Sequence, residues 1–589
     1  MMRTTFRLLP IAAVCSLMAA CGGGSNTPSQ TTSAAAATPA APTLLVSRDT
    51  FDPTFTMGLG SILPINNTPE ATSGSTIVSV PSTAVGFPNM FTLSGGSSAL
   101  DPNFGVTADM AIDQWAPGAT APTLFMDVTQ AAQQQGLEDI TSSFSSKSED
   151  ALNLSQDGTA ITFNEYNAPI DQLDRSNSNT PGVIDPSNTD VAQPTYRAVV
   201  QLNLASKTLQ VTNTNGFSGN NGRASVLVNG QYYIIGNAGN SGSTPSPTYG
   251  IVDTLTMDTG VQTIAAGSSC AFSQVIGAFN TASGSSYAPA ASGACSLGTI
   301  TDANASLTYS KKTTGVGGNQ FGFSLAQVSG QTADKTGKDD NFRGLYLGPD
   351  GTLYVSKGSG GNGVNTVFQV GTTGALASGQ LPQTSAITPL FLPNGPTGVA
   401  ATNLSTSANW QLSYGTAFPF GMWIPKSNPN IMFVADEGDL TSTGTSMTTG
   451  AAGGSGGLWV YQNSNGKWTP IAHLTQGLNM GTPYTVTDTK GVYGKAGASM
   501  TTQPDGLRNI AGQVNADGSF TLYAITSTVG DTLANVDEGV DPNQLVKITV
   551  NVNGSTVTPT GSGFSVMETA PYGQVLRGVA LVPTTTSSN

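Results

Sequence analysis

The chain has 589 residues, a formal net charge of −14, only 10% charged residues and 71 glycines. The negative balance argues against nucleic acid and anionic membrane surfaces as partners, because no basic patch is present to neutralise phosphates. Abundant Gly, together with many Ser, Thr and Asn residues, is typical of a turn-rich, all-β protein that works outside the cytoplasm.

The first 20 residues predict a lipoprotein signal peptide. Two arginines precede an apolar run from Leu8 to Met18, and small residues lead up to Cys21. The phrase Met18-Ala-Ala-Cys21 resembles a bacterial lipobox, in which Cys21 carries the lipid; an ordinary secretory signal is the alternative. Gly22 follows the cysteine, which by analogy with enteric lipoproteins indicates the outer membrane. Residues 21–42 are a low-complexity tether, and no later stretch is long and apolar enough to span a bilayer.

From residue 43 onwards the sequence repeats one pattern, an apolar strand, a tight turn and a second apolar strand. Copies of this pattern start at Ala151, Arg223, Phe342, Phe420 and Leu507. Their turns contain phrases such as Asn229-Gly and Pro349-Asp-Gly, and further strand-like segments follow each copy. A repeat of many tens of residues that is built from strand pairs predicts a β-propeller with four-stranded blades.

The two ends of this region predict how the propeller closes. The segment that starts at Leu576 matches a first strand of the repeat, and the segment that starts at Thr43 matches a second strand. Pairing them completes a sixth blade and removes exposed strand edges. We therefore expect residues 43–589 to form one six-bladed propeller, with seven blades as the alternative because the spacing from Arg223 to Arg343 is long.

Residues 267–335 contain no convincing copy of the repeat and are interpreted as an insertion. It holds Cys270 and Cys295, the two cysteines that remain once the signal peptide is removed and Cys21 is lipidated. In an oxidising compartment these two are expected to form a disulfide, and two buried thiols are the alternative.

Polar residues gather where the strands of the repeat begin and end. Seven arginines follow the signal peptide, and four of them begin the first strand of a copy. The candidate ligand-binding residues are Arg223, Arg343, Arg508, Arg577, Glu165, Lys357, Asp436 and Glu437. In a propeller such positions meet at one mouth of the central channel, where guanidinium groups and carboxylates can face one ligand. The same charges can instead pair between neighbouring blades and hold the ring together.

Oxygen-bearing side chains at the starts of these strands could also bind a hard cation such as Ca²⁺, which takes six to eight oxygen ligands. The candidates are Glu149, Asn221, Asn341 and Asp505. His473 is the only histidine of the chain, which argues against a serine–histidine triad and a multi-histidine zinc site. An enzyme of this sequence would depend on carboxylates, Arg, Lys, Tyr or a metal.

Two kinds of phrase carry a family resemblance. Thr352-Leu-Tyr-Val-Ser and Ile431-Met-Phe-Val-Ala-Asp-Glu resemble the six-bladed NHL and SMP-30/gluconolactonase-like propellers, over roughly residues 43–585. Residues 144–154 and 354–363 are similar to an uncharacterised group of secreted propellers. The resemblance implies the fold, and the lactonases among these proteins hold a divalent metal with Glu, Asn and Asp side chains.

These observations lead to one main hypothesis and two alternatives. We expect an envelope-anchored, monomeric lipoprotein that binds a small molecule, a glycan or a protein at the channel mouth without catalysing a reaction. The alternatives are a metal-dependent hydrolase or lactonase and a purely structural envelope protein.

Overall fold

The structure is a computed structural model that describes most of the chain after residue 41. The described residues are 42–54, 106–143, 147–172, 175–181, 194–237, 261–276, 341–358, 365–378, 417–438, 456–492, 496–530 and 539–583, with the short strands 56–57, 64–65, 68–69, 85–86, 286–288, 299–301 and 388–391. Residues 41–589 form one compact unit. The predicted signal peptide, Cys21, nearly all of the tether, Cys295 and most of the predicted insertion lie outside the described residues.

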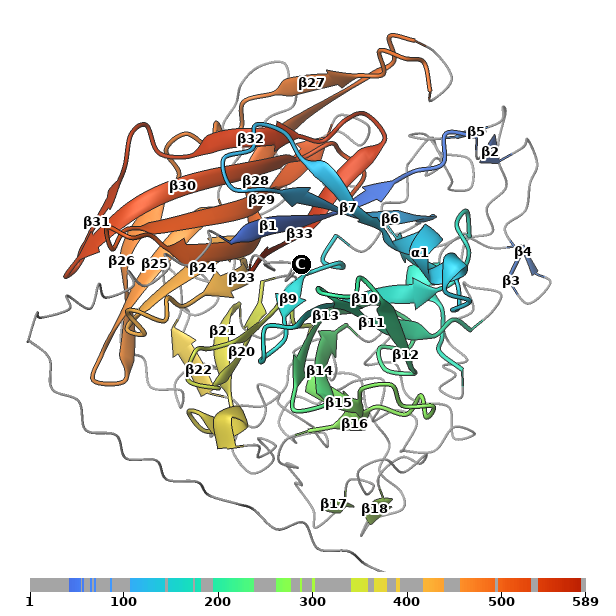
Figure 1. The fold of residues 1–589 in the computed structure, drawn as a ribbon, viewed down its shortest axis with the longest axis horizontal. Coiled ribbons are helices and arrows are strands. Elements are labelled where there is room, and N and C mark those ends of the chain that lie inside the picture. Colours follow the sequence, from blue (N-terminus) through green and yellow to red (C-terminus); the bar gives the residue numbers. More distant parts are fainter. Residues whose placement is uncertain are drawn as a thin grey trace, which may run out of the picture. The chain divides into compact units, whose positions relative to one another are not determined.

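The largest sheet has nine strands and contains both the first and the last of the long strands (Figure 1). Its main path runs through β12 (Leu209–Thr214), β11 (Arg197–Asn203), β10 (Ala160–Asn167), β8 (Ile140–Ser143), β6 (Thr107–Trp115), β1 (Thr43–Thr50) and β33 (Gln574–Val582), while β7 (Thr123–Asp127) pairs with β6 and β9 (Asn153–Leu154) pairs with β10. The short helix α1 (Val128–Gln134) follows β7, and its first turn is capped by Asp127, which accepts a hydrogen bond from the backbone N–H of Gln130 at 2.7 Å.

Four further sheets of four or six strands make up most of the remaining described structure. Those with four strands are β13 (Gly222–Val228), β14 (Gln231–Gly236), β15 (Val261–Ala265) and β16 (Gln274–Val275); β19 (Gly344–Leu347), β20 (Leu353–Lys357), β21 (Thr366–Val370) and β22 (Thr388–Phe391); and β23 (Pro419–Trp423), β24 (Ile431–Asp436), β25 (Gly457–Ser464) and β26 (Lys467–Leu474). The six-stranded sheet contains β27 (Tyr484–Thr487), β28 (Ser499–Val514), β29 (Phe520–Gly530), β30 (Gln544–Asn553), β31 (Thr556–Pro559) and β32 (Ser565–Thr569).

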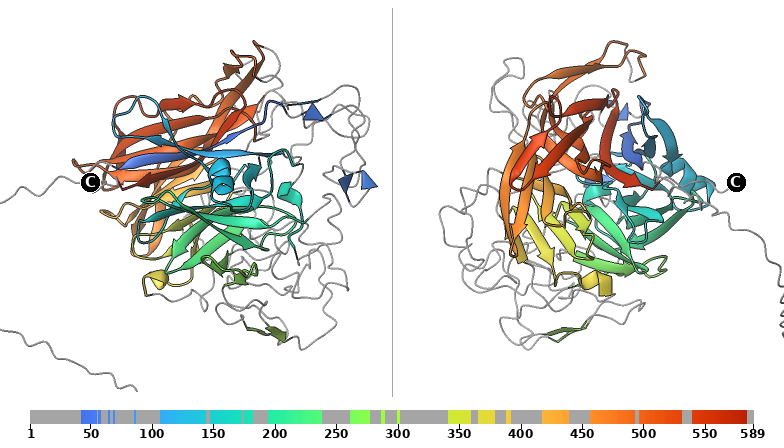
Figure 2. Two further views of the ribbon diagram at one scale, coloured as in Figure 1. Left: turned by 45° about the vertical axis from the view of Figure 1, so that its right-hand side comes forward. Right: turned by 60° about the vertical axis from the view of Figure 1, so that its left-hand side comes forward.

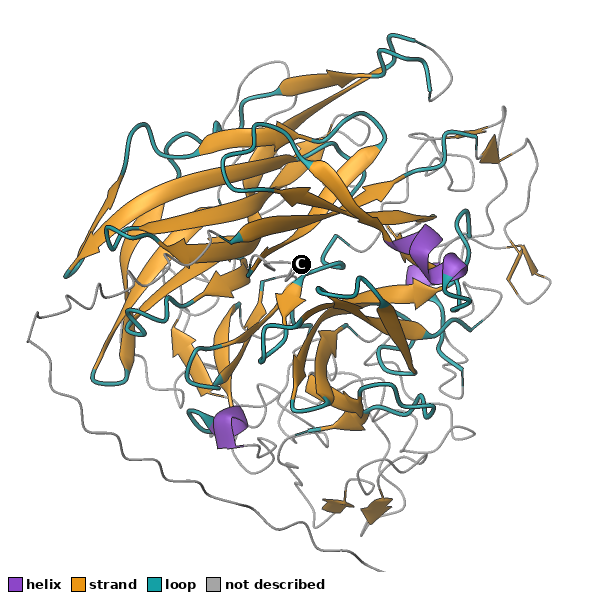
Figure 3. Cartoon of the chain, viewed as in Figure 1, coloured by secondary structure: helices purple, strands orange, loops and turns teal. Residues whose placement is uncertain are grey.

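The regular structure is almost entirely β, as Figure 3 shows. Short two-stranded pairs are formed by β2 (Thr56–Met57) with β5 (Val85–Gly86), β3 (Pro64–Ile65) with β4 (Thr68–Pro69), and β17 (Ser286–Ala288) with β18 (Thr299–Thr301). The described residues also include the short 3₁₀ helices η2 (Arg175–Asn177) and η4 (Ala375–Ser378). The expected all-β class is thus confirmed. Across the described part of the chain, α1 and the 3₁₀ turns are too short to cross a membrane.

The hairpin turns follow from local sequence. Asn229 and Gly230 join β13 to β14 and have φ angles of 50° and 75°, as a two-residue hairpin turn of this kind requires at both positions. In the turn before β20, Asp350 accepts hydrogen bonds from the backbone and the hydroxyl of Thr352 at 3.0 and 2.8 Å. These local turns confirm the strand–turn–strand pattern at both sites.

The expected ring of six four-stranded blades is wrong, and so is the seven-bladed alternative. Only three of the described sheets have four strands, and the others of comparable size have six and nine. Two segments expected in separate blades, β10–β12 and the strands around β1, are joined because β8 pairs with both β10 and β6, at Tyr166↔Thr141 and Thr107↔Ser143. The backbone N–H and C=O groups at the edge of a sheet are unpaired until another strand forms hydrogen bonds with them. Here β8 pairs with the edges of both segments and joins them into one sheet.

The strands β1 and β33 form an antiparallel pair, from Thr43↔Val582 to Thr50↔Gln574. Side chains alternate between the two faces of a strand, and both faces of this pair are buried. Leu44 and Leu576 pack in one apolar cluster, while Leu45 and Ala580 pack in another with Phe163. The two strands lie side by side in both views of Figure 2 as well. They therefore lie inside the packed structure rather than at its margin.

Candidate ligand-binding pocket

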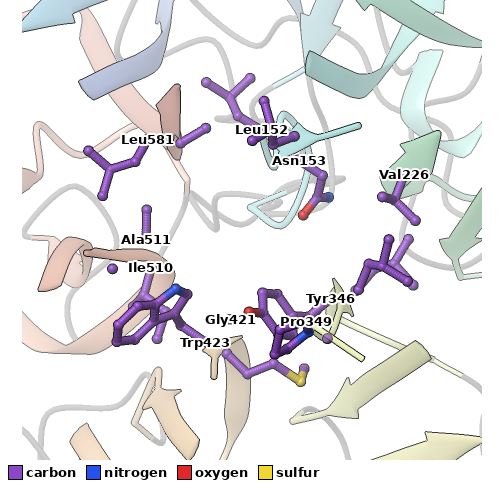
Figure 4. A pocket seen from close by; sticks show the side chains of 18 of the residues that line it. Leu152, Asn153, Val226, Tyr346, Pro349, Gly421, Trp423, Ile510, Ala511 and Leu581 are labelled. Carbon is purple, nitrogen blue, oxygen red and sulfur yellow. The ribbon is translucent and has the colours of Figure 1, made fainter. Parts of the chain in front are cut away.

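A pocket of about 530 Å³ lies where strands from five sheets come together. Its lining comes from β9, β13, β19, β23, β28, β33 and the turns beside them, and includes residues 151–156, Val226, 344–351, 421–423, 509–512 and 579–581. Figure 4 shows Leu152, Asn153, Val226, Tyr346, Trp423, Ile510 and Leu581 around the same space. A concave site built from so many elements is largely preformed.

Glycines allow the backbones of these strands to approach closely. A Cβ at Gly344 would lie 2.1 Å from the carbonyl oxygen of Phe420, and a Cβ at Gly578 would lie 2.0 Å from that of Asp150. At the second contact the Ser47 hydroxyl donates to the Asp150 carbonyl at 2.9 Å and accepts from the Gly578 N–H at 2.6 Å. No side chain fits at these two glycine positions unless the backbone moves, so the strands around the pocket are closely spaced.

Two aromatic residues form part of the wall. The Tyr346 hydroxyl donates to the Ile424 carbonyl at 3.1 Å and accepts from the Ile424 N–H at 3.2 Å, which fixes the ring. Burial raises the pKa of Tyr346 above its usual value. The half-buried Trp423 ring packs against Phe433 and Phe520, with centroids 5.7 and 5.9 Å away, and a Cβ at Gly512 would lie 2.3 Å from it. Both rings are therefore held in place from behind.

Two asparagines are among the uncharged polar residues of the wall. The Nδ2 group of Asn153 donates to the carbonyl of Ser225 at 3.0 Å, and that of Asn509 donates to the carbonyl of Arg577 at 3.0 Å. Each amide thus bonds to the backbone of a neighbouring strand through its nitrogen. Figure 4 shows the Asn153 oxygen on the side of the pocket.

The ionisable lining groups at the edge of the pocket are exposed. Asp350 and Lys426 are both solvent-exposed, and the Asp350 carboxylate is occupied by Thr352 in its turn. Ser155 also lines the pocket, but its hydroxyl donates to Asp157 at 2.6 Å and accepts from the backbone of Thr159 and Ala160. These polar groups are bound within turns.

The predicted cationic residues lie just before the pocket-lining residues on the same strands, and they are largely buried. Arg577 pairs with Asp49 at 2.8 Å and Arg508 pairs with Glu437 at 3.2 Å. Arg223 donates to the Phe342 carbonyl at 2.9 Å and to the side chain of Asn341. These contacts join neighbouring strands, which favours the alternative in which the arginines hold the structure together.

The other predicted ligand-binding residues are placed in similar surroundings. Arg343 donates to the Ser148 hydroxyl, and the buried Lys357 lies 3.5 Å from the Asn365 side-chain oxygen. Neither side chain lines the pocket. A role of Arg343 and Lys357 in ligand binding stays a prediction.

Two predicted acidic residues are buried and have raised pKa values. Burial raises the pKa of Asp436 to about 6, although the carboxylate accepts hydrogen bonds from the N–H groups of Phe418 and Gly438 and from the indole of Trp459. Glu165 is buried beside Asp150, and desolvation followed by the Asp150 charge raises its pKa. Neither residue lines the pocket.

The predicted metal ligands have other contacts. Glu149 accepts a hydrogen bond from the Tyr166 hydroxyl, and Asn341 accepts one from Arg223. Asp505 lies against Gly438, and Asn221 is buried at the start of β13. Within the ranges that the structure describes, no three His, Cys, Asp or Glu side chains are grouped to hold a metal ion. Two of the four predicted Ca²⁺ ligands are asparagines, which are not among these four residue types. The Ca²⁺ site therefore stays a prediction.

The disulfide also stays a prediction. Cys270 is buried after β15, and Cys295 is outside the described residues.

Sequence reasoning missed the residues that line the pocket. Asn153, Tyr346, Trp423 and Asn509 are not among the candidate site residues that the sequence indicates. A signal was present, since Asn509 directly follows Arg508 and Tyr346 follows Arg343 by three positions. The residues that line the pocket therefore follow the predicted charged residues on the same strands.

No protein-family model matches the chain, and no curated protein matches it. Solved structures with some likeness include the extracellular domain of a one component system from B. thetaiotaomicron (8% identity, 73% of this chain, 38% of that chain, TM-score 0.25). Another is a GH74 enzyme from Niastella koreensis (10% identity, 78% of this chain, 71% of that chain, TM-score 0.26). A third is a post-proline cleaving enzyme from Rickettsia typhi (8% identity, 78% of this chain, 56% of that chain, TM-score 0.22). The chain thus spans about 38% and 56% of the first and third. At these TM-scores the likenesses assign neither a fold nor a function.

Proposed function

We propose that this chain is a non-enzymatic binding protein whose ligand occupies the pocket between β9, β13, β19, β23, β28 and β33. The pocket itself carries the proposal, because strands of five sheets place aromatic rings and a few uncharged polar groups around one space of about 530 Å³. Small-molecule sites commonly combine an apolar, concave wall with few polar groups in this way.

The lining favours binding over catalysis. Acid–base and nucleophilic catalysis need a titratable or nucleophilic group within hydrogen-bond reach of its partner and of the substrate. Here Asp350 is exposed and bound in a turn, and the Ser155 hydroxyl is occupied by its own turn. The buried arginines nearest to the lining, Arg508 and Arg577, are in ion pairs. No observation on the described residues favours the metal-dependent hydrolase.

A protection experiment tests the position of the site. In a Lys426→Cys variant the new thiol lies at the exposed edge of the pocket, and in a matched Ser555→Cys variant it lies in an exposed turn outside the lining. Compounds that raise the melting temperature of the full-length protein are expected to slow labelling by a maleimide at position 426 and to leave position 555 unchanged. A compound that binds stoichiometrically but leaves labelling at 426 at its original rate would place the site elsewhere.

We also propose that a lipid on Cys21 holds the protein at the bacterial cell envelope, with the outer membrane as the expected location. The support is the lipobox-like phrase in the sequence. A Cys21→Ser variant is expected to lose labelling by a palmitate analogue and to leave the membrane fraction. Retention of the label would contradict the anchor.

A further inference from the structure

We propose that the ligand of this pocket is a neutral molecule rich in hydroxyl groups, such as a short saccharide, whose hydroxyls donate to the amide oxygens of Asn153 and Asn509 and whose C–H face lies on Trp423. This inference rests on the proposed function, because it names the class of molecule that the same pocket takes.

The orientation of the two amides is fixed. Each Nδ2 group donates to a backbone carbonyl of a neighbouring strand, Asn153 to Ser225 and Asn509 to Arg577, both at 3.0 Å. Flipping either amide would place two carbonyl oxygens against each other. The amide oxygens accept no hydrogen bond from any described residue. The wall thus offers two acceptors, and a ligand must donate to both in order to satisfy them.

The indole of Trp423 adds a donor and an apolar surface. Its ring is held by Phe433, Phe520 and the close approach of Gly512. Among the described residues its N–H makes no hydrogen bond, and Figure 4 shows the indole nitrogen on the side that faces the pocket. A hydroxyl group both donates and accepts, so a molecule with several hydroxyls can satisfy the two amide oxygens and the indole N–H together.

Charge argues against ionic ligands. The only lining residues with a full charge near neutral pH are Asp350 and Lys426, and both are exposed at the edge. A carboxylate or phosphate bound deep in the pocket would lose water without gaining a guanidinium, since Arg577 is bound to Asp49 and Arg508 to Glu437. A purely aliphatic ligand would fill the volume but would cover both amide oxygens without a donor, which is unfavourable for each.

Calorimetric titration of the full-length protein tests the class of ligand. Three probe sets are compared: neutral trisaccharides (maltotriose, cellotriose and xylotriose), the acidic trimer of galacturonate, and decanol. We expect a neutral trisaccharide to bind and to protect the Lys426→Cys thiol. Asn153→Leu and Asn509→Leu should each weaken that binding about tenfold, the loss expected for one hydrogen bond in a site built around it. Asn551→Leu, at an exposed position of β30 outside the lining, serves as the matched variant that should leave it unchanged.

Deoxy analogues of the bound sugar provide a second measurement that does not depend on folding of the asparagine variants. Removal of the hydroxyl that meets an amide oxygen should cost about as much as the corresponding asparagine substitution, and the two losses should not add. Protection by decanol or the acidic trimer alone would overturn the ligand class and leave the proposed function standing. If protective compounds exist and none is a neutral polyol, the class is wrong; if no compound of any class protects position 426, the proposed function fails as well.

Discussion

Breaking the ion pair between Arg577 of β33 and Asp49 of β1 should destabilise the protein strongly. The two side chains are separated by 528 positions in sequence, lie 2.8 Å apart and are 1% and 0% exposed. Removing one partner of such a pair leaves the other charge buried, which typically costs about 3–5 kcal/mol. An Arg577→Met variant keeps an unbranched apolar stem and loses the bond to Asp49 as well as the 3.1 Å bond from Nη2 to the Gly539 carbonyl.

The loss of free energy determines how far the melting temperature should fall. An unfolding entropy near 2.1 cal/mol/K per residue gives roughly 1.2 kcal/mol/K for a chain of 589 residues, so a loss of about 3–5 kcal/mol should lower the melting temperature by about 2–4 °C. Arg48→Met is the matched control, because Arg48 also lies on β1 and pairs with Asp113 at 2.7 Å, but is 16% exposed. The Arg48→Met variant should therefore lose less stability than Arg577→Met.

A double-mutant cycle isolates the interaction. Urea unfolding of Arg577→Met, Asp49→Asn and the double variant should show that the double variant is more stable than the sum of the two single losses implies. A loss below about 1 kcal/mol for Arg577→Met, or strict additivity of the two substitutions, would refute the reasoning.

Three further outcomes follow from the described contacts. Gly578→Ala should lower the unfolding midpoint strongly, because its Cβ would lie 2.0 Å from the Asp150 carbonyl, whereas Ser555→Ala in an exposed turn should not. The folded pKa of Asp436, about 6, lies above its unfolded value of 3.8, so the free energy of unfolding should fall as pH rises from about 4 to 6 and then level off. Asp436→Asn should reduce this dependence of the free energy of unfolding on pH, measured by denaturation at a series of pH values. An unchanged pH dependence would contradict the raised pKa of Asp436. A chain that ends at residue 573 lacks β33 and should lose cooperative unfolding by circular dichroism, a result that a native-like melt would exclude.

The sequence-based prediction succeeded where the cause is local. The hairpin at Asn229-Gly230 was predictable because two residues with positive φ are needed there and this pair adopts them readily. The all-β class followed from many short apolar segments separated by turn residues. Both inferences depend only on neighbours along the chain.

The prediction failed where the cause is a contact between distant segments. Pairing of β8 with both β6 and β10 merges two expected blades into one sheet, and no local pattern specifies which edges meet. Likewise, Arg577 was identified as a candidate, but its partner Asp49 could not be inferred from spacing. Trp423 illustrates a third reason, since one ring both packs on Phe433 and lines the pocket, and a sequence does not separate the two roles.

The pairing of β1 with β33 also bears on how the protein matures. Asp49 of β1 and Arg577 of β33 are 528 positions apart, so β1 cannot find its partner until the chain between them has been synthesised, and the slowest folding step should be this closure rather than hairpin formation. Until then the early segments expose unpaired backbone and remain open to proteases and chaperones. We therefore expect the early strands to reach their native protection from proteolysis only after β33 has paired with β1.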